Sequence, residues 1–318
     1  MLSPSELVRD YDALRHGLGG AWVDRDVIRV AGPQAIAYLQ GQLSQDVVAL
    51  AVGGSAPSLL LSPQGKVDAW LRVTRVADDA CLLDVDAGWG EAVMERLGRF
   101  KLRTKMEMSA GAAWRCLALR GPGVAGVPGA AGLVVPAFWP GVEGVDLLGE
   151  SVEVPPGVTL VGPDALRALR VEAGVPAMGS ELGPKTIPAE AGLVAASVSF
   201  TKGCYTGQEL VARIDSRGNR VPRRLRGVVV AWELLERLGA ASASALAHPH
   251  SSPPPVGAEL VLDDKVVGAL TSVASSPGLE AVVALAYVRR EVEPPVELSL
   301  RWDDASVAAQ VRELPLVG

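Results

Sequence analysis

Histidine is scarce in this sequence of 318 residues, which contains only three. His16 lies near the start, whereas His248 and His250 lie in a tract rich in proline and serine. No His-x-x-x-His or Cys-x-x-Cys spacing occurs, so the sequence predicts no zinc site and no other metal site. A Ser-His-Asp triad would have to use one of these three histidines, and we therefore do not expect this type of hydrolase.

Cysteine is equally rare. Cys81, Cys116 and Cys204 are odd in number and far apart, which is typical of a reducing compartment and leaves at least one free thiol. No basic segment followed by an apolar stretch opens the chain, so no secretory signal is visible. The longest strongly apolar stretches, such as Ala281–Val288, fall far short of the ~20 residues of a membrane helix. We expect a soluble, cytoplasmic protein without a membrane partner.

Positive charge is in the minority, because 30 Lys and Arg stand against 36 Asp and Glu and the net charge is −6. A dedicated nucleic-acid-binding protein is usually basic overall, so we expect no stable nucleic-acid complex. The segment from Lys202 to Arg226 is the exception, with seven cations, two anions and a local charge of +5. An RNA-binding module built on this segment is one alternative function, and its binding would weaken steeply with salt.

The length is sufficient for two or three domains. Within a first region of residues 1–222, the predicted elements of residues 26–97 show a β–β–α rhythm that favours an α+β fold over a doubly wound sheet. After residue 223, short strand-like runs separated by turns predict a C-terminal β-barrel, with the low-complexity segment 238–256 as a long surface loop. Strands are predicted at Asp26–Val30, Leu59–Leu61, Val67–Val76 and Cys81–Val85, and helices at 35–40, Trp89–Leu97 and Pro163–Val171.

Basic and mostly apolar residues alternate from Arg99 to Met106, which predicts a strand with one basic face. This face is either solvated or turned toward an anion such as phosphate or polyglutamate.

The densest chemistry lies in the octet Lys-Gly-Cys-Tyr-Thr-Gly-Gln-Glu at residues 202–209. Thr206 and Glu209 have the spacing of a capping box, so we expect a helix to begin there. Cys204 would then lie just before a helix N-terminus and beside Lys202, where the helix dipole and nearby cations favour the reactive thiolate. The alternative is that Cys204 is a small buried hydrophobic residue and the arginines pair with acidic residues elsewhere.

Two carboxylates are further candidates. Glu172 ends a predicted helix, where the dipole disfavours an anion, so it should have a specific partner. A ligand with paired N–H donors, such as a pterin or guanine edge, would suit it, and so would an arginine on the surface. Asp68 follows a turn at Gly65 and either orients a ligand amine or caps the turn. Cys81 and Cys116 are expected to be inert core residues.

These features, in this order, resemble the YgfZ-type folate-binding proteins, relatives of the glycine-cleavage T-protein (aminomethyltransferase). The octet matches the YgfZ signature, and weaker matches extend the resemblance over roughly residues 22–228. The resemblance implies a three-domain ring with two mixed α/β domains and a C-terminal β-barrel around a channel that holds tetrahydrofolate. It also implies a role in assembling or maintaining iron–sulfur enzymes, including a tRNA-modifying one. The weaker blocks are residues 28–33, 38–43, 63–67, 100–105 and 172–176.

The leading hypothesis is therefore a tetrahydrofolate-binding accessory protein whose partners are folate and iron–sulfur client or assembly proteins. Glu172 would bind the pterin edge, and Tyr205 or a tryptophan would stack on a flat ring. The segment Arg213–Arg226 would attract the folate glutamate tail or an acidic partner. Cys204 would act as an exposed thiolate, either for transient persulfide or cluster contact or for redox chemistry, but one thiolate cannot hold a cluster alone. The full candidate set is Cys204 and Asp68 as reactive groups, with Glu172, Arg170, Lys202, Gly203, Tyr205, Gln208, Glu209 and Arg213 toward the cofactor.

The alternative hypothesis is a tetrahydrofolate-dependent aminomethyl or C1 transferase. In the T-protein, adjacent acidic residues follow the glycine turn. Here only Asp68 is acidic, and Ala69 and Trp70 follow it. Neighbouring residues on a strand face opposite sides, so the missing second carboxylate puts aminomethyl transfer in doubt.

Overall fold

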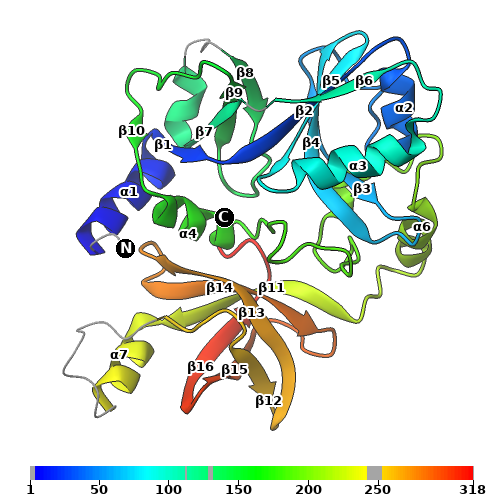
Figure 1. The fold of residues 1–318 in the computed structure, drawn as a ribbon. Helices are drawn as coiled ribbons and strands as arrows, with labels where there is room; N and C mark the ends of the chain where they lie inside the picture. Colours follow the sequence, from blue (N-terminus) through cyan, green and yellow to red (C-terminus); the bar gives the residue numbers. More distant parts are fainter. Residues whose placement is uncertain (1–3, 112, 128–131, 242–252, 318) are drawn as a thin grey trace.

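The computed structural model describes residues 4–111, 113–127, 132–241 and 253–317 (Figure 1). These residues form two five-stranded sheets and a closed barrel. The helices in this part of the chain are α1 (Pro4–His16), α2 (Ala35–Gln42), α3 (Gly90–Lys101), α4 (Pro163–Glu172), α5 (Val194–Ser197), α6 (Gln208–Ser216) and α7 (Trp232–Ala241), with a 3-10 helix at Pro122–Gly126. No helix in the described ranges is both long and apolar enough to cross a membrane.

The first two sheets are interleaved along the chain. The first has the order β10-β1-β7-β9-β8 and the second the order β3-β4-β5-β2-β6. Because β1 and β2 follow each other directly but belong to different sheets, the whole second sheet is inserted between β1 and β7, which pair with each other. The first sheet comprises β1 (Gly19–Val23), β7 (Arg115–Arg120), β8 (Leu133–Pro136), β9 (Gly144–Gly149) and β10 (Thr159–Leu160); the second comprises β2 (Arg25–Ala31), β3 (Ser55–Leu61), β4 (Val67–Ala77), β5 (Ala80–Asp86) and β6 (Glu107–Ala110).

The C-terminal strands close into a barrel in the order β11-β14-β13-β12-β15-β16. Its interior is a separate apolar core in which Val228, Leu260 and Leu300 are fully buried. The predicted α+β ring with a C-terminal barrel is confirmed. The strands are β11 (Arg223–Ala231), β12 (Glu259–Leu262), β13 (Lys265–Ser276), β14 (Ala281–Arg289), β15 (Val296–Trp302) and β16 (Ala305–Arg312).

Helix α4 lies in the middle of the molecule, between the barrel and the two sheets, next to the C-terminus (Figure 1). Pro163 occupies the first turn, where its missing N–H does no harm. The helix ends in a Schellman motif, with Gly174 at φ 72° and the Val175 N–H donating to the Arg170 carbonyl. The Leu316 N–H donates to the Glu172 carbonyl at 2.7 Å, so the C-terminal segment returns to this helix.

Two sequence predictions are wrong. Residues 99–101 continue α3, and Leu102 then leaves the helix at φ 42°, so the predicted strand Arg99–Met106 does not exist. The basic residues there end a helix, where the dipole favours cations, and this pattern resembles strand alternation over a short window. The predicted loop 238–256 is also partly wrong, because residues 238–241 belong to α7. Residues 242–252 lie outside the described part of the chain.

Candidate functional site

Lys202 fastens the loop between α5 and α6 to the end of α2. Its Nζ donates hydrogen bonds to the carbonyl oxygens of Gln40 at 2.5 Å, Leu43 at 2.6 Å and Gln45 at 2.9 Å. These carbonyls lie at the C-terminal end of α2, where the helix dipole favours a cation. Burial lowers the pKa of Lys202 to about 8, which still leaves the amine mostly protonated at neutral pH. The lysine of the octet therefore stabilises the folded loop.

Two glycines bring the loop and the preceding turn into direct backbone contact. Gly207 has φ 82°, and a Cβ there would lie 2.5 Å from the Ser62 carbonyl oxygen. Gly65 has φ 73°, and a Cβ there would lie 2.9 Å from the Gly207 carbonyl oxygen. Only glycine combines this backbone conformation with this close approach. Two motifs that are far apart in the sequence thus form one structural unit.

Tyr205 is buried inside this unit and does not point into solvent. Its ring lies 5.1 Å from the Lys202 Nζ, and its N–H donates to the Gln208 side-chain oxygen at 3.2 Å. Burial raises the pKa of Tyr205 to about 12. The tyrosine cannot stack on a ligand here, and Gln208 stabilises the loop.

The predicted capping box is wrong. Helix α6 begins at Gln208, its N-cap is Gly207, and no side chain caps it. The Thr206 N–H instead donates to the Gly41 carbonyl, because the left-handed Gly207 turns the chain between Thr206 and the helix. Glu209 lies exposed in the first turn of α6, and Arg213 lies exposed further along it.

Cys204 is exposed at the tip of this stabilised loop, so the alternative of a buried Cys204 is wrong. A Cβ added at the preceding Gly203 would meet nothing within 4 Å, so packing does not require that glycine. Cys81 and Cys116 are buried in strands, and burial raises the pKa of both thiols, that of Cys81 to about 11. The loop leaves one thiol, flanked by open space, available for chemistry.

Asp68 lies close to this unit but serves a different contact. The pairing of β3 with β4 skips it, so Asp68 is the extra residue of a β-bulge, which redirects its side chain. Its carboxylate accepts a hydrogen bond from the Arg96 Nε at 3.0 Å, and the Arg96 Nη2 donates to the Leu61 carbonyl. Asp68 therefore connects β4 to α3.

Glu172 is fully buried at the end of α4. Its Oε2 accepts a hydrogen bond from the Tyr11 hydroxyl at 2.8 Å, and burial raises the pKa of the carboxyl group. A tyrosine of α1, not an arginine, thus binds one oxygen of this carboxylate, while the buried Oε1 has no hydrogen-bond partner among the described residues. Arg170, one half-turn earlier, points elsewhere and donates to the Val175 carbonyl and the Ser272 hydroxyl. The structure does not bring Glu172 and Cys204 together.

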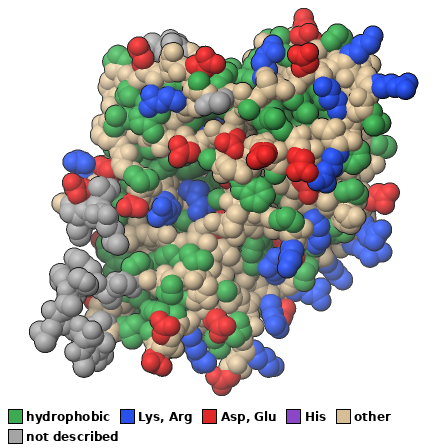
Figure 2. All heavy atoms as spheres, viewed as in Figure 1, with side chains coloured by type: hydrophobic (Ala, Val, Ile, Leu, Met, Phe, Trp, Pro, Cys, Tyr) green, Lys and Arg blue, Asp and Glu red, His purple; other side chains and the backbone are tan. Residues whose placement is uncertain are grey.

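A cleft of about 270 Å³ lies between the two sheets and α4. Figure 2 shows this face of the molecule hollowed near its middle, with basic side chains inside the hollow. Of the candidate cofactor residues, only Arg170 lines the cleft, and Cys204, Asp68 and Glu172 do not. The walls combine flat aromatic rings and guanidinium groups, chiefly Trp22, Trp70, Trp139, Arg72, Arg120 and Arg170.

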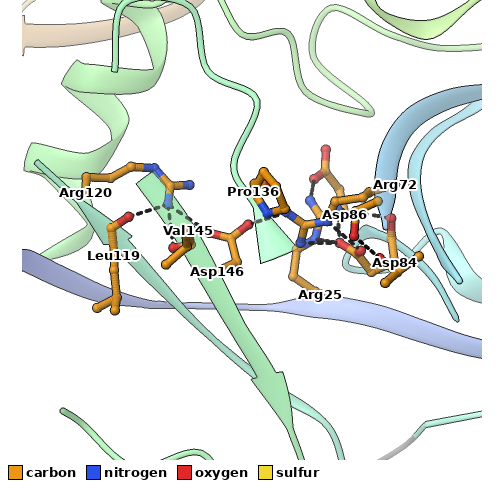
Figure 3. A network of polar contacts seen from close by, with 11 residues as sticks. Arg25, Arg72, Asp84, Asp86, Leu119, Arg120, Pro136, Val145 and Asp146 are labelled. Carbon is orange, nitrogen blue, oxygen red and sulfur yellow. Dashed lines mark hydrogen bonds and ion pairs between the residues drawn. The ribbon is translucent and has the colours of Figure 1, made fainter. Parts of the chain in front are cut away.

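A chain of ion pairs joins the two sheets (Figure 3), and most of its residues line the cleft. Arg72 of β4 binds Asp84 at 2.9 Å and Asp146 of β9 at 2.8 Å, and Arg120 binds the other oxygen of Asp146 at 2.8 Å. Arg25 continues the chain on the Asp84 side. Burial alone would raise the pKa of Asp146, but Arg120 and Arg72 lower it to about 2. The network fixes the relative positions of the two sheets.

Arg120 also contributes to the wall of the cleft. Its guanidinium lies 4.2 Å from the centre of the Trp139 ring, a cation–π contact that fixes the ring. Its Nε is buried and has no hydrogen-bond partner among the described residues. An unsatisfied buried donor is costly, so this nitrogen is a suitable contact for a ligand oxygen.

Hydrogen bonds connect the cleft with the loop of Cys204. The Trp70 Nε1 donates to the Ser197 hydroxyl at 3.0 Å, and the Ser44 hydroxyl donates to the Ser197 carbonyl at 2.6 Å. Ser44 lies between Leu43 and Gln45, whose carbonyls bind Lys202. The cleft and the exposed thiol are thus two sites on one rigid framework.

Sequence reasoning missed Glu181 and the whole cleft. Glu181 is buried and accepts hydrogen bonds from the Ser272 hydroxyl at 2.7 Å and the Ala177 N–H at 2.9 Å, and it forms an ion pair with Arg170 at 3.4 Å. It positions Arg170 at the edge of the cleft. No spacing signals this role, because the partners come from distant segments. In the described ranges, no group of three or more His, Cys, Asp or Glu side chains could hold a metal ion.

A family model and a solved structure both match this chain to the glycine cleavage T-protein. Residues 245–317 match the glycine cleavage T-protein C-terminal barrel domain. A solved structure of the glycine cleavage system aminomethyltransferase T from Bartonella henselae has a TM-score of 0.79 and 23% identity, and the match covers 100% of this chain and 91% of that one. This likeness shows that the two proteins share a fold.

Relatives are also found among curated proteins. An uncharacterized protein from Haemophilus influenzae is 32% identical over 197 residues, 60% of this chain and 66% of that protein. The tRNA-modifying protein YgfZ of Klebsiella pneumoniae is 31% identical over 218 residues, 59% and 64% of the two chains. The mitochondrial iron-sulfur cluster assembly factor IBA57 homolog of Phaeosphaeria nodorum is 28% identical over 214 residues, 61% and 51%. The matched part of the chain thus spans between half and two thirds of these three relatives.

Proposed function

We propose, from the premise that this chain is a YgfZ-type protein related to the glycine-cleavage T-protein, that it is a folate-binding accessory protein for iron–sulfur enzymes. In this proposal the central cleft binds tetrahydrofolate, and Cys204 is the reactive group toward an iron–sulfur client or assembly protein. The clients include tRNA-modifying enzymes. The proposal rests above all on an exposed thiol in a loop that Lys202 and the buried Tyr205 hold in place.

The chemistry of the cleft supports a folate ligand. Tetrahydrofolate combines flat rings with a carboxylate tail, and the cleft combines partly exposed tryptophans with arginines. Trp22 is 37% exposed, and Arg115 stacks on its ring at 3.8 Å, which fixes its orientation. Arg167 and Arg170 lie along the α4 side of the cleft, where they could bind carboxylates through charge-assisted hydrogen bonds. In this arrangement a tryptophan, rather than Tyr205, stacks on the ligand, and Arg167 and Arg170 replace Arg213.

The exposure of Cys204 supports transient chemistry with a partner. Iron–sulfur clusters typically take four ligands, so a single thiolate on this chain can hold a cluster or a sulfur only together with another protein. Cys204 is exposed, so a partner protein can reach its side chain. The candidate roles of this thiol are persulfide contact, cluster contact and redox chemistry.

The alternative is a tetrahydrofolate-dependent aminomethyl or C1 transferase, which the shared fold with the T-protein favours. A transferase needs a carboxylate within hydrogen-bond reach of the reacting amine. Asp68 is bound to Arg96 outside the cleft, and Asp146 inside it is bound to two arginines. These engagements favour the accessory role over turnover.

Titration of the pure protein with tetrahydrofolate, followed by calorimetry, tests the folate proposal. We expect binding that Trp22→Ala weakens about tenfold, equivalent to about 1.4 kcal/mol of lost stacking. Trp302→Ala, the same change on the barrel outside the cleft, should leave the affinity unaltered. Absence of binding by the wild-type protein would contradict the proposal that this protein binds folate.

Complementation of a bacterium lacking its own YgfZ-type protein tests the role of the thiol. The readout is the level of a tRNA modification made by an iron–sulfur enzyme. We expect Cys204→Ser to abolish complementation and Asp68→Asn to retain it. The reverse result would support the transferase.

A further inference from the structure

Arginine side chains gather on one surface of the molecule. This surface extends from α6 through the following loop to one end of the barrel, where β11 begins and β14 ends. Figure 2 shows Lys and Arg side chains gathered at the lower right of the molecule, over α6 and the adjoining part of the barrel. We call this surface the arginine track, and it consists of Arg213, Arg217, Arg220, Arg223, Arg289 and Arg290.

Positive charges lie close together on the arginine track. Arg223 and Arg289 are directly opposite each other in the antiparallel pair of β11 and β14. Arg220 and Arg290 line the same surface hollow, in which Glu291 is the one acidic residue among the described lining. Like charges directly opposite in a sheet are destabilising. A bound anion would remove this repulsion.

Arg223 is positioned in advance for an anion. Its Nε donates to the buried Glu190 carboxylate at 3.2 Å, and its guanidinium lies 4.2 Å from the centre of the Tyr287 ring. These contacts fix the plane of the group, while 42% of the side chain remains exposed. No hydrogen bond of its two Nη atoms occurs among the described residues, so both are available. A guanidinium held in this way matches the oxygens of a phosphate bidentately.

The other members of the track have little or no pairing. Glu291 is 3.9 Å from Arg289, at the limit of an ion pair. By contrast, Arg99 and Arg301 on other surfaces are bonded to Glu95 and Asp264. No carboxylate among the described residues is bonded to Arg213, Arg217, Arg220 or Arg290.

The character of the surrounding surface favours a nucleic-acid backbone over a protein partner. Protein interfaces depend on a few buried aromatic or aliphatic anchors. No large hydrophobic side chain is exposed in the described segments 208–226 and 287–293. Contacts to a phosphate backbone need only cations and hydrogen-bond donors in an extended arrangement. The track extends along a helix, a loop and two strand ends, which suits a chain of phosphates.

We propose that the arginine track binds the phosphodiester backbone of a structured RNA, without reading its sequence. This inference goes beyond the proposed function and does not depend on folate or on Cys204. Because the whole chain has a net charge of −6, the complex should be weak and strongly salt-dependent rather than stable. RNA bound along α6 would lie on the element that directly follows the loop of Cys204.

Fluorescence anisotropy with a labelled, unmodified tRNA transcript tests this proposal over a series of salt concentrations. The logarithm of the binding constant should fall linearly with the logarithm of the salt concentration. The double variant Arg220→Gln/Arg290→Gln should lower the steepness of this line by about 2, roughly 1 for each lost phosphate contact. Both side chains are exposed, so the fold should persist.

Arg301→Gln is the matched control, because Arg301 is exposed on β15, away from β11 and β14 in the order of the barrel. The variant should bind the tRNA transcript with unchanged affinity and salt dependence. An RNA hairpin of unrelated sequence should bind the wild-type protein as tightly as the transcript does. Failure of the wild type to bind RNA at 50 mM salt would overturn the proposal. So would an unchanged salt dependence in the double variant. Tighter binding of a polyglutamate peptide than of RNA, lost in the double variant, would identify an acidic protein as the partner instead.

Discussion

The cleft and the arginine track use the same side chain in opposite ways. In the cleft, Arg72 and Arg120 are buried and bound to Asp84 and Asp146, so their charges are neutralised within the protein. On the track, Arg220 and Arg290 are exposed and have no carboxylate partner among the described residues. The paired arginines build the shape of a binding site, whereas the unpaired arginines remain available to an external ligand. The same division separates the buried cysteines from Cys204.

The largest contrast should be in thiol reactivity. When the native protein is treated with a disulfide reagent, Cys204 should react rapidly and release one equivalent of the thiol of the reagent. Cys204→Ser should abolish this rapid phase of the reaction. Cys81 and Cys116 are buried, so they should react only after opening of the fold, at least about a thousandfold more slowly. Simultaneous reaction of all three thiols would contradict the contrast.

Breaking the ion-pair network should be the next largest effect. Asp146→Ala leaves Arg72 and Arg120 buried without their shared partner, and we expect a loss of about 3–5 kcal/mol in the free energy of unfolding. Glu95→Ala removes the exposed partner of Arg99 and should change stability by less than about 0.5 kcal/mol. Denaturant titration of both variants measures the difference, and equal losses would refute it.

The same carboxylate predicts a pH dependence. The native pKa of Asp146 is lowered to about 2 from the ordinary 3.8. A lowered carboxyl pKa contributes stability that is fully present above the ordinary value and is lost as the pH falls from about 3.8 through 2. Asp146→Asn should flatten the dependence of unfolding free energy on pH in this window. A parallel curve for wild type and variant would assign the acid sensitivity to other groups.

Two glycines of the octet give a matched pair. Gly207→Ala forces a side chain into a left-handed residue and against the Ser62 carbonyl, and we expect a loss of about 2 kcal/mol together with a displaced loop. Gly203→Ala introduces the same methyl group into open space and should change stability by less than about 0.5 kcal/mol. Thermal unfolding distinguishes them, and if Gly203→Ala is the more damaging change, the account of the loop is wrong.

The smallest effect should come from Glu172→Gln. Burial raises the pKa of Glu172 in the native state, so the contribution of this group to stability falls as the pH rises through the interval between its ordinary and its native pKa. The glutamine keeps an oxygen for the Tyr11 hydroxyl and cannot ionise. We expect equal or slightly higher stability at pH 7, by up to about 1 kcal/mol, and unchanged folate affinity. A large loss of affinity would return Glu172 to the ligand site.

Much of the fold could be predicted from the sequence because local periodicity decided it. Strands such as Val67–Ala77 and the barrel strands have burial patterns that follow from apolar runs between turns. The prediction failed at Arg99–Met106, where alternation over eight residues fits the end of an amphipathic helix as well as a strand. It failed again at Thr206, where the left-handed Gly207 determines the start of α6.

The candidate site was predictable only where its parts are contiguous. The octet marks the loop of Cys204 because its residues act within a few positions of each other. The cleft has no such mark: Trp22, Trp70 and Trp139 are isolated tryptophans in separate strands or loops, and only the tertiary fold brings them to one cavity. For Glu172 the sequence correctly predicted that the carboxylate needs a partner, but it could not identify Tyr11, which is 161 residues away.

The insertion of the second sheet between β1 and β7 constrains the order in which the molecule assembles. Pairing of Val23 with Cys116 closes a loop of about ninety residues, which for an unfolded chain costs about 4 kcal/mol of conformational entropy. If the inserted sheet forms first, its own ends, β2 and β6, pair with each other and bring the flanking segments together. The inserted sheet should therefore fold before the sheet that contains β1 and β7. A destabilising substitution in the inserted sheet would then prevent β1 from pairing with β7, even though every residue of those strands is unchanged.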